Sequence, residues 1–187
     1  MLPMHPRGYR VIPWRGGTMS RQDDLHALLA PERQPQVLKD LGDFFGPGSE
    51  AFFEVYDKMK ARKLSGVQIG WNWPVFLFSF VWFFYRKMWI FGASVILLPV
   101  ILSLLIGSAG LGGGAIIFAM VANSIYVRSA LSRILKADAL GLTGEARSDY
   151  LRRAGGVSPV AGGIAAVLFV LFFAAAIYGI LAGPPPA

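Results

Sequence analysis

Cysteine is absent from this sequence of 187 residues, and histidine occurs only twice, as His5 and His26. The absence of cysteine excludes disulfide bonds, thiolate metal sites and a cysteine nucleophile. Charge is also scarce, since Asp, Glu, Lys and Arg make up 16% of the residues, against about 25% in a typical soluble domain. A surface that faces water everywhere needs more charge, so we expect part of the surface to face something else.

Acidic residues are missing from the middle of the chain. None lies between Asp57 and Asp138, and residues 160–182 contain none either. The apolar parts of the sequence therefore offer no carboxylate for a proton relay and no imidazole or thiolate for haem or a metal ion. Their serine residues have no base beside them. We expect no cofactor, no metal site and no enzymatic activity.

Hydrophobic residues, which make up 55% of the chain, gather in four runs after the polar N-terminal third. A helix that spans a membrane needs about 20 residues. The runs at 88–107, 111–127 and 160–182 reach this length, whereas the run at 74–85 is too short. The sequence therefore predicts an all-α membrane protein with three transmembrane helices and one short aromatic helix, which is either interfacial or re-entrant.

The distribution of charge predicts the orientation. Lys and Arg accumulate in the cytoplasmic segments of membrane proteins. The connection at 108–110 has no charge, and if residues 74–85 do not span, every charged residue of the chain falls on one side. We therefore expect a cytoplasmic N-terminus and a C-terminus across the membrane. This bias already explains the net charge of +7, so nucleic acid is not expected as a partner.

Three parts are expected along the chain. Residues 1–48 form a cytoplasmic N-terminal segment, and we leave open whether the first 18 are disordered or come from an upstream start codon. Residues 49–70 contain a basic amphipathic helix that we expect at the membrane surface, with packing on a soluble core as the alternative. Residues 71–187 form the membrane domain, in which residues 128–159 are a basic cytoplasmic loop of two short helices.

Aromatic residues are densest around the short run at 74–85. Trp and Tyr favour the headgroup level of a membrane, and neighbouring basic residues add attraction to acidic lipids. We favour membrane anchoring over the alternative, a stacking platform for a quinone, pigment or lipid. The predicted anchor residues are Trp71, Trp73, Trp82, Tyr85, Arg86, Lys87 and Trp89.

Small residues four positions apart predict close contacts between helices. The glycines at 110–115 superficially suggest a dinucleotide-binding loop, but no βαβ unit surrounds them. One amide inside a predicted span also needs a partner, and we favour an interhelical hydrogen bond over ligand binding. The predicted packing residues are Gly110, Gly114, Asn123, Ala175 and Gly179.

Two strings carry a resemblance to a known family: Asn72–Phe78 (NWPVFLF) and Trp82–Trp89 (WFFYRKMW). With the preceding Phe45-Gly46-Pro47, they resemble the signature of the bacterial membrane family called domain of unknown function 2628, over roughly residues 44–105. The resemblance implies a multi-pass protein of the bacterial inner membrane and supplies no activity.

The expected function follows from these absences and from the predicted packing surfaces. We expect a non-enzymatic accessory, assembly or regulatory component of a membrane complex, in a bilayer with acidic headgroups. Its partner would be another membrane protein or further copies of the same chain. The alternative is a small oligomeric transporter or channel subunit.

Overall fold

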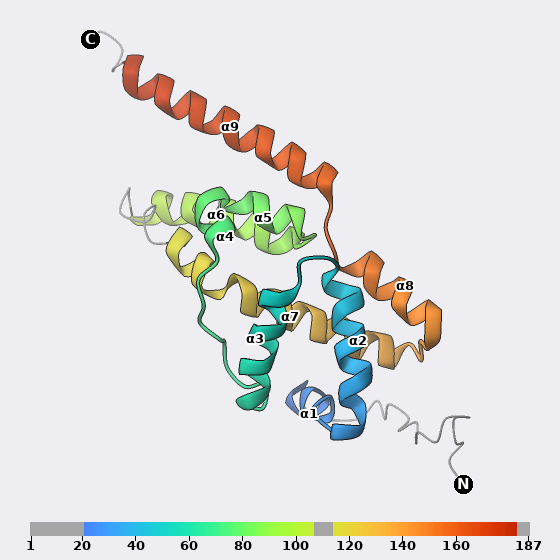
Figure 1. The fold of residues 1–187 in the computed structure, drawn as a ribbon. Helices are drawn as coiled ribbons and strands as arrows, with labels where there is room; N and C mark the ends of the chain where they lie inside the picture. The colour runs from blue at the N-terminus through green and yellow to red at the C-terminus, as the bar shows by residue number, and fades with distance from the viewer. Residues whose placement is uncertain (1–20, 107–113, 183–187) are drawn as a thin grey trace.

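The described part of the chain, residues 21–106 and 114–182 of a computed structural model, consists of helices and short connections without a β-strand (Figure 1). The prediction of an all-α protein is confirmed. In chain order the helices are α1 (Arg21–Ala27), the 3-10 helix η1 (Pro31–Arg33), α2 (Gln34–Phe45), α3 (Glu50–Ala61), α4 (Trp73–Phe78), α5 (Phe80–Tyr85), α6 (Trp89–Ile106), α7 (Gly114–Ala139), α8 (Gly144–Ala154) and α9 (Pro159–Ala182).

The central element is α7, a single helix of 26 residues. We expected a span at 111–127 followed by a separate short helix at the start of the loop at 128–159. The structure corrects this expectation, because one continuous helix covers both. No Gly or Pro lies between Ala115 and Ala139, so the sequence has no residue that would end the helix at Val127. The buried apolar side chains of α7 follow a helical spacing: Ala119, Ala122, Tyr126, Val127, Ala130, Leu131, Ile134 and Ala137.

The amphipathic helices α2, α3 and α8 surround the C-terminal part of α7. The apolar stripe of α3 is buried against this core, as is the stripe of α2 that includes Val37, Leu41 and Phe44. This burial agrees with the alternative that we left open, packing on a core, and the location of the helix at the membrane surface stays a prediction. The stripe is covered by the chain itself because α7 offers an apolar face of matching length. These stripe residues of α3 are Phe52, Val55, Tyr56 and Met59.

The short aromatic run folds as two helices, α4 and α5, and not as one. Asn72 caps α4 by accepting a hydrogen bond from the backbone N–H of Val75 at 2.9 Å, and Pro74 occupies the first turn, where its missing N–H costs nothing. The break falls at Ser79, whose φ of 49° and ψ of −120° are not helical. The run therefore bends back on itself between residues 78 and 80.

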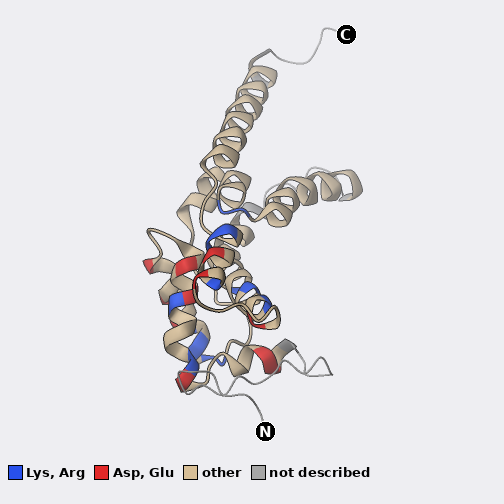
Figure 2. Cartoon of the chain, turned by 90° about the vertical axis from the view of Figure 1, so that its right-hand side faces the viewer, with Lys and Arg blue, Asp and Glu red and all other residues tan. Residues whose placement is uncertain are grey.

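Helix α9 contacts α5 and otherwise projects away from the rest of the molecule (Figure 1). The ring of Phe169 lies 5.9 Å from that of Phe80 and 6.5 Å from that of Phe78. Figure 2 shows that α6 and α9 carry no charged side chain, whereas the charged residues gather on the helices around α7. The chain thus has a polar half and an apolar half.

Within the described ranges, one helical segment is long and apolar enough to cross a membrane by length and composition. It includes α9, and its most apolar window has a mean hydropathy of 2.6 with 11% of that window buried. The apolar helix Trp89–Leu105 is shorter. The prediction of three transmembrane helices is therefore not confirmed by this criterion.

Candidate functional site

Three connections of the chain meet beside Tyr126 of α7, and we call this place the junction. The backbone N–H of Gly156 donates to Phe44 O at 2.6 Å, and that of Ser158 donates to Tyr85 O at 2.7 Å. The hydroxyl of Tyr126 donates to Gly156 O at 3.4 Å. The end of α2, the α5–α6 turn and the α8–α9 connection are thereby held together.

Glycine is required at one position of the junction. A Cβ atom added to Gly155 would lie 2.2 Å from Phe44 O and 2.6 Å from the Phe44 ring. Real Cβ atoms do not approach a backbone oxygen so closely, so a larger residue would push α2 away from the α8–α9 connection. This close approach is what lets Gly156 reach Phe44.

Arg86 lies inside the junction among aromatic rings. Its guanidinium carbon is 4.7 Å from the centre of the Phe52 ring and 5.3 Å from that of Tyr126, which are cation–π distances. Its Nη1 donates to Phe45 O at 3.2 Å. Among the described residues, no carboxylate forms a salt bridge with it, and its Nε is buried without a partner.

The predicted membrane anchors therefore separate into two groups. Trp82 is 8% exposed, so it is corrected from an anchor to a core residue, whereas Arg86 is half-buried with its guanidinium among aromatic rings. Lys87 is half-buried and donates to Arg153 O at 3.2 Å. Trp71, Trp73, Tyr85 and Trp89 are exposed.

Two of the exposed tryptophans form a cluster at the start of α4. The Trp71 and Trp73 rings lie 5.5 Å apart, and each contacts the ring of Phe76, at 5.0 and 6.1 Å. These exposed rings combine apolar area with indole N–H groups. Such side chains suit a boundary between an apolar phase and water.

Asn123 finds its partner in the α3–α4 connection and not in another long helix. Its side-chain oxygen accepts a hydrogen bond of 2.6 Å from Asn72 Nδ2. Asn72 is buried and also caps α4, so one side chain fixes the start of α4 and ties it to α7. This double role gives a physical reason for the Asn-Trp-Pro string.

Among the other predicted packing residues, the structure describes the surroundings of Ala175 and Gly179 only. Gly110 lies outside the described residues, and Gly114 is the first residue of α7. A Cβ atom on Gly179 would meet nothing within 4 Å, and Ala175 is exposed. The packing role of this face of α9 stays a prediction. Gly162 instead makes the close contact, since its Cβ would lie 2.9 Å from the Tyr85 ring.

The family described as protein of unknown function (DUF2628) matches residues 44–136. The chain belongs to this family. The resemblance seen over residues 44–105 is confirmed, and the match continues to near the end of α7. It contains Arg86, Tyr126 and the Asn72–Asn123 pair, while α8 and α9 lie beyond it. No curated protein and no solved structure matches the chain.

Ion pairs attach α8 to the DUF2628 region. Asp40 of α2 is fully buried, and one of its oxygens accepts from Arg147 Nε at 2.9 Å and Nη2 at 2.6 Å. Arg147 Nη1 donates to Asp138 at 2.7 Å, and Asp138 pairs with Arg33 at 2.6 Å. Burial acts to lower the pKa of Arg147, but hydrogen bonds and charge from Asp40 and Asp138 raise it overall.

The sequence analysis of this DUF2628 protein missed the network. A signal existed, because Asp40 falls between Val37 and Leu41 on the apolar stripe of α2, where an acid is costly unless it is paired. The sequence could not name Arg147 as its partner, which lies 107 residues away.

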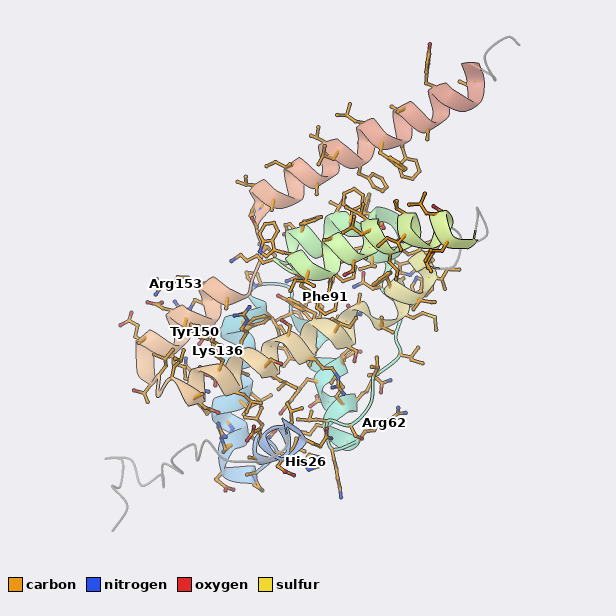
Figure 3. The ribbon with its side chains drawn as sticks, turned by 180° about the vertical axis from the view of Figure 1, so that it is seen from behind. His26, Arg62, Phe91, Lys136, Tyr150 and Arg153 are labelled. Atoms are coloured by element: carbon orange, nitrogen blue, oxygen red, sulfur yellow. The ribbon has the colours of Figure 1, made fainter. Side chains whose placement is uncertain are left out.

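No group of three or more His, Cys, Asp or Glu side chains that could hold a metal ion occurs within residues 21–106 and 114–182. A shallow depression on α8, lined by Leu142, Ala146, Tyr150, Arg153 and Ala154, is mostly apolar. Figure 3 shows Tyr150 and Arg153 on this helix, with Lys136 of α7 beside them.

Proposed function

We propose that this DUF2628 protein is an integral membrane protein with a non-enzymatic accessory or assembly role. In this proposal the apolar half lies in the bilayer of a bacterial inner membrane. The polar half, built from α2, α3, α8 and the C-terminal part of α7, lies in the cytoplasm. The observation that carries the proposal is the separation of the charged residues (Figure 2) from the exposed apolar side chains of α6 and α9.

The extent of the exposed apolar surface supports a bilayer environment. Soluble monomers rarely expose a contiguous apolar patch larger than a few hundred Å². Here the exposed side chains of α6 and α9 are large and apolar, and several are more than half exposed. Residues in this class are Ile90, Leu97, Leu104, Val160, Val167, Phe172 and Leu181.

The junction supports three spans, as the sequence predicts. Helix α6 begins just after Lys87, α9 begins just after Ser158, and α7 passes Tyr126 at the same place. Three apolar segments therefore diverge from one level, and the charged helices lie on its other side. This arrangement is what three spans entering from one surface require.

The segment before α5 supports the re-entrant alternative for residues 74–85. The preceding connection runs beside α7, where Gly70 N–H donates to Met120 O at 2.9 Å and Asn72 N–H donates to Ala119 O at 3.0 Å. Helix α5 then returns to the junction at Tyr85. Non-helical backbone at membrane depth must have its polar groups satisfied within the protein, and these two hydrogen bonds to α7 satisfy the N–H groups of Gly70 and Asn72.

The accessory role is supported by the unoccupied face of α9 at Ala175 and Gly179. Small residues let a second helix approach closely, and no described part of this chain covers them. A partner membrane protein or another copy of the chain would supply the missing helix.

Reporter fusions test the membrane arrangement. Fusions after Lys63, Gly110, Arg153 and Ala187 should report cytoplasm, outside, cytoplasm and outside in turn. A fusion after Lys87 should report cytoplasm if residues 74–85 enter and return. Release of the full chain from membranes by alkaline carbonate would contradict the proposal, because integral proteins resist this treatment.

Co-purification tests the role itself. Extraction from native membranes in mild detergent should yield the chain in a discrete complex with another membrane protein, as an accessory component requires. A homo-oligomer that conducts ions or solutes in liposomes would contradict the accessory role and favour a transporter or channel subunit.

A further inference from the structure

Two basic residues of the junction, Lys87 and Arg153, are in contact, and neither has an acidic partner among the described residues. Lys87 Nζ donates to Arg153 O at 3.2 Å, and Arg153 Nε donates to Asp149 O at 3.3 Å. Both acceptors are backbone carbonyl oxygens. Among the described residues, no carboxylate forms a salt bridge with either cation.

The acids nearby are already paired with other cations. Asp149 pairs with Arg152 at 3.6 Å, and Asp43 pairs with Lys39 at 2.8 Å and with Arg152 at 3.3 Å. Burial acts to raise the pKa of Asp43, but hydrogen bonds from Lys39, Ser148 and Arg152 lower it overall. Both carboxylates thus already have cationic partners, and Lys87 and Arg153 have none among the described residues.

A third cation, Arg86, adds to the positive electrostatic potential near Lys87 and Arg153. Arg86 adjoins Lys87 in the chain, and its charge is balanced by rings and a carbonyl, not by a carboxylate. Aromatic faces stabilise a cation without neutralising it. Three uncompensated charges thus occur in the α5–α6 turn and at the end of α8.

We propose that Lys87 and Arg153 bind the phosphate of one acidic phospholipid at the junction, with Arg86 reinforcing the potential. This inference rests on the proposed membrane function. Phosphate is the chemistry that uncompensated ammonium and guanidinium groups recognise.

The surroundings favour a lipid over free inorganic phosphate. Exposed apolar side chains begin beside the cations, at Trp89 and Ile90 of α6 and at Val160 of α9. Acyl chains attached to the phosphate would lie along these helices, whereas inorganic phosphate would gain nothing from them.

Native mass spectrometry of the full chain in detergent tests the site, with phosphatidylglycerol and phosphatidylcholine as the probes. The wild-type chain should retain one phosphatidylglycerol in preference to phosphatidylcholine. The double variant K87Q/R153Q should retain it roughly 30-fold less, because each basic residue near acidic lipid contributes about a factor of five. The control R62Q/K63Q removes the same charge at the end of α3, away from Arg153 in Figure 3, and should change retention little.

Three results would overturn the inference. Equal retention of the two lipids, equal loss in both double variants, or displacement of phosphatidylglycerol by millimolar inorganic phosphate would each do so. The reporter fusions separate this failure from failure of the proposed function. If they alternate as expected while lipid selectivity is absent, only the lipid site is wrong, whereas a chain released by carbonate overturns both.

Discussion

At the scale of single residues, the most consequential side chain is an acid in an apolar place. Asp40 has no exposed surface, and its charge is tolerated because Arg147 meets it with two donors. The Gln36 side chain donates to its second oxygen at 2.7 Å. The pair connects α2 to α8, so it specifies which helices neighbour each other in the polar half.

We predict that Arg147→Met destabilises the polar half by about 3–5 kcal/mol, because it leaves a buried carboxylate without its partner. Thermal unfolding in mild detergent, followed by circular dichroism, measures the loss. The control Arg152→Met removes an arginine whose side chain is 58% exposed and should cost no more than about 1 kcal/mol. Equal losses for the two variants would show that the buried pair stabilises the fold no more than an exposed pair does. The double variant D40L/R147M should recover much of the stability.

A second prediction concerns backbone strain at Ser79. Its φ of 49° with ψ of −120° is a conformation that glycine adopts more readily than serine. Ser79→Gly should therefore raise the free energy of unfolding by about 1 kcal/mol, seen as a higher unfolding midpoint. Ser103→Gly, placed inside α6, is the control and should lower stability. A lower midpoint for Ser79→Gly would show that the bend is not strained.

At the scale of elements, the positions of the helices were predictable from the sequence pattern. The point at which α7 ends and the break between α4 and α5 were not. The run at 160–182 corresponds to α9, and the second of the two short helices expected in the loop at 128–159 corresponds to α8. The sequence analysis ended the third run at Val127 because Arg128 follows, but charge marks a change of surroundings and does not end a helix. Ser79 shows the opposite case, since neither Gly nor Pro signals the break there.

The α8–α9 connection allows a matched pair of substitutions. Gly155→Ala places a Cβ atom 2.2 Å from Phe44 O, so we predict a loss of at least about 1–3 kcal/mol, as in other overpacked sites. In α9, a Cβ atom on Gly163 would meet nothing within 4 Å. Gly163→Ala should therefore leave stability unchanged or raise it by up to about 1 kcal/mol. Unfolding midpoints of the two variants give the comparison, and equal midpoints would contradict the close approach at Phe44.

At the scale of the whole molecule, charge and hydropathy predicted the two halves, but not what fills the junction. The anchor prediction treated every aromatic and basic residue near 74–85 as a surface group, because the sequence does not show which side chains the N-terminal helices cover. Trp82 is a core residue, and Arg86 is half-buried, because Phe52 of α3 packs against both. That contact depends on tertiary folding and has no local signal.

We predict that Leu171→Arg, near the middle of α9, impairs membrane insertion. An arginine at the centre of a spanning helix costs about 2.5–3.5 kcal/mol on the biological insertion scale. The fraction of protein that resists alkaline carbonate measures the effect. The control Leu140→Arg changes a similarly exposed leucine, 56% against 59%, in the polar half, and should not alter insertion. Equal resistance of both variants would contradict a bilayer location for α9.

The Asp40–Arg147 pair also bears on biogenesis. During synthesis Asp40 emerges long before Arg147, and the two predicted spans of α6 and α7 lie between them in the chain. In the proposed topology both spans cross, so that α2 and α8 return to one compartment and the pair can close. A chain that inserted with one span missing would strand Asp40 and Arg147 on opposite sides, leaving each charge to be buried alone or the helices to stay apart. Completion of the polar half would therefore act as a check on correct topology, carried out by the protein itself.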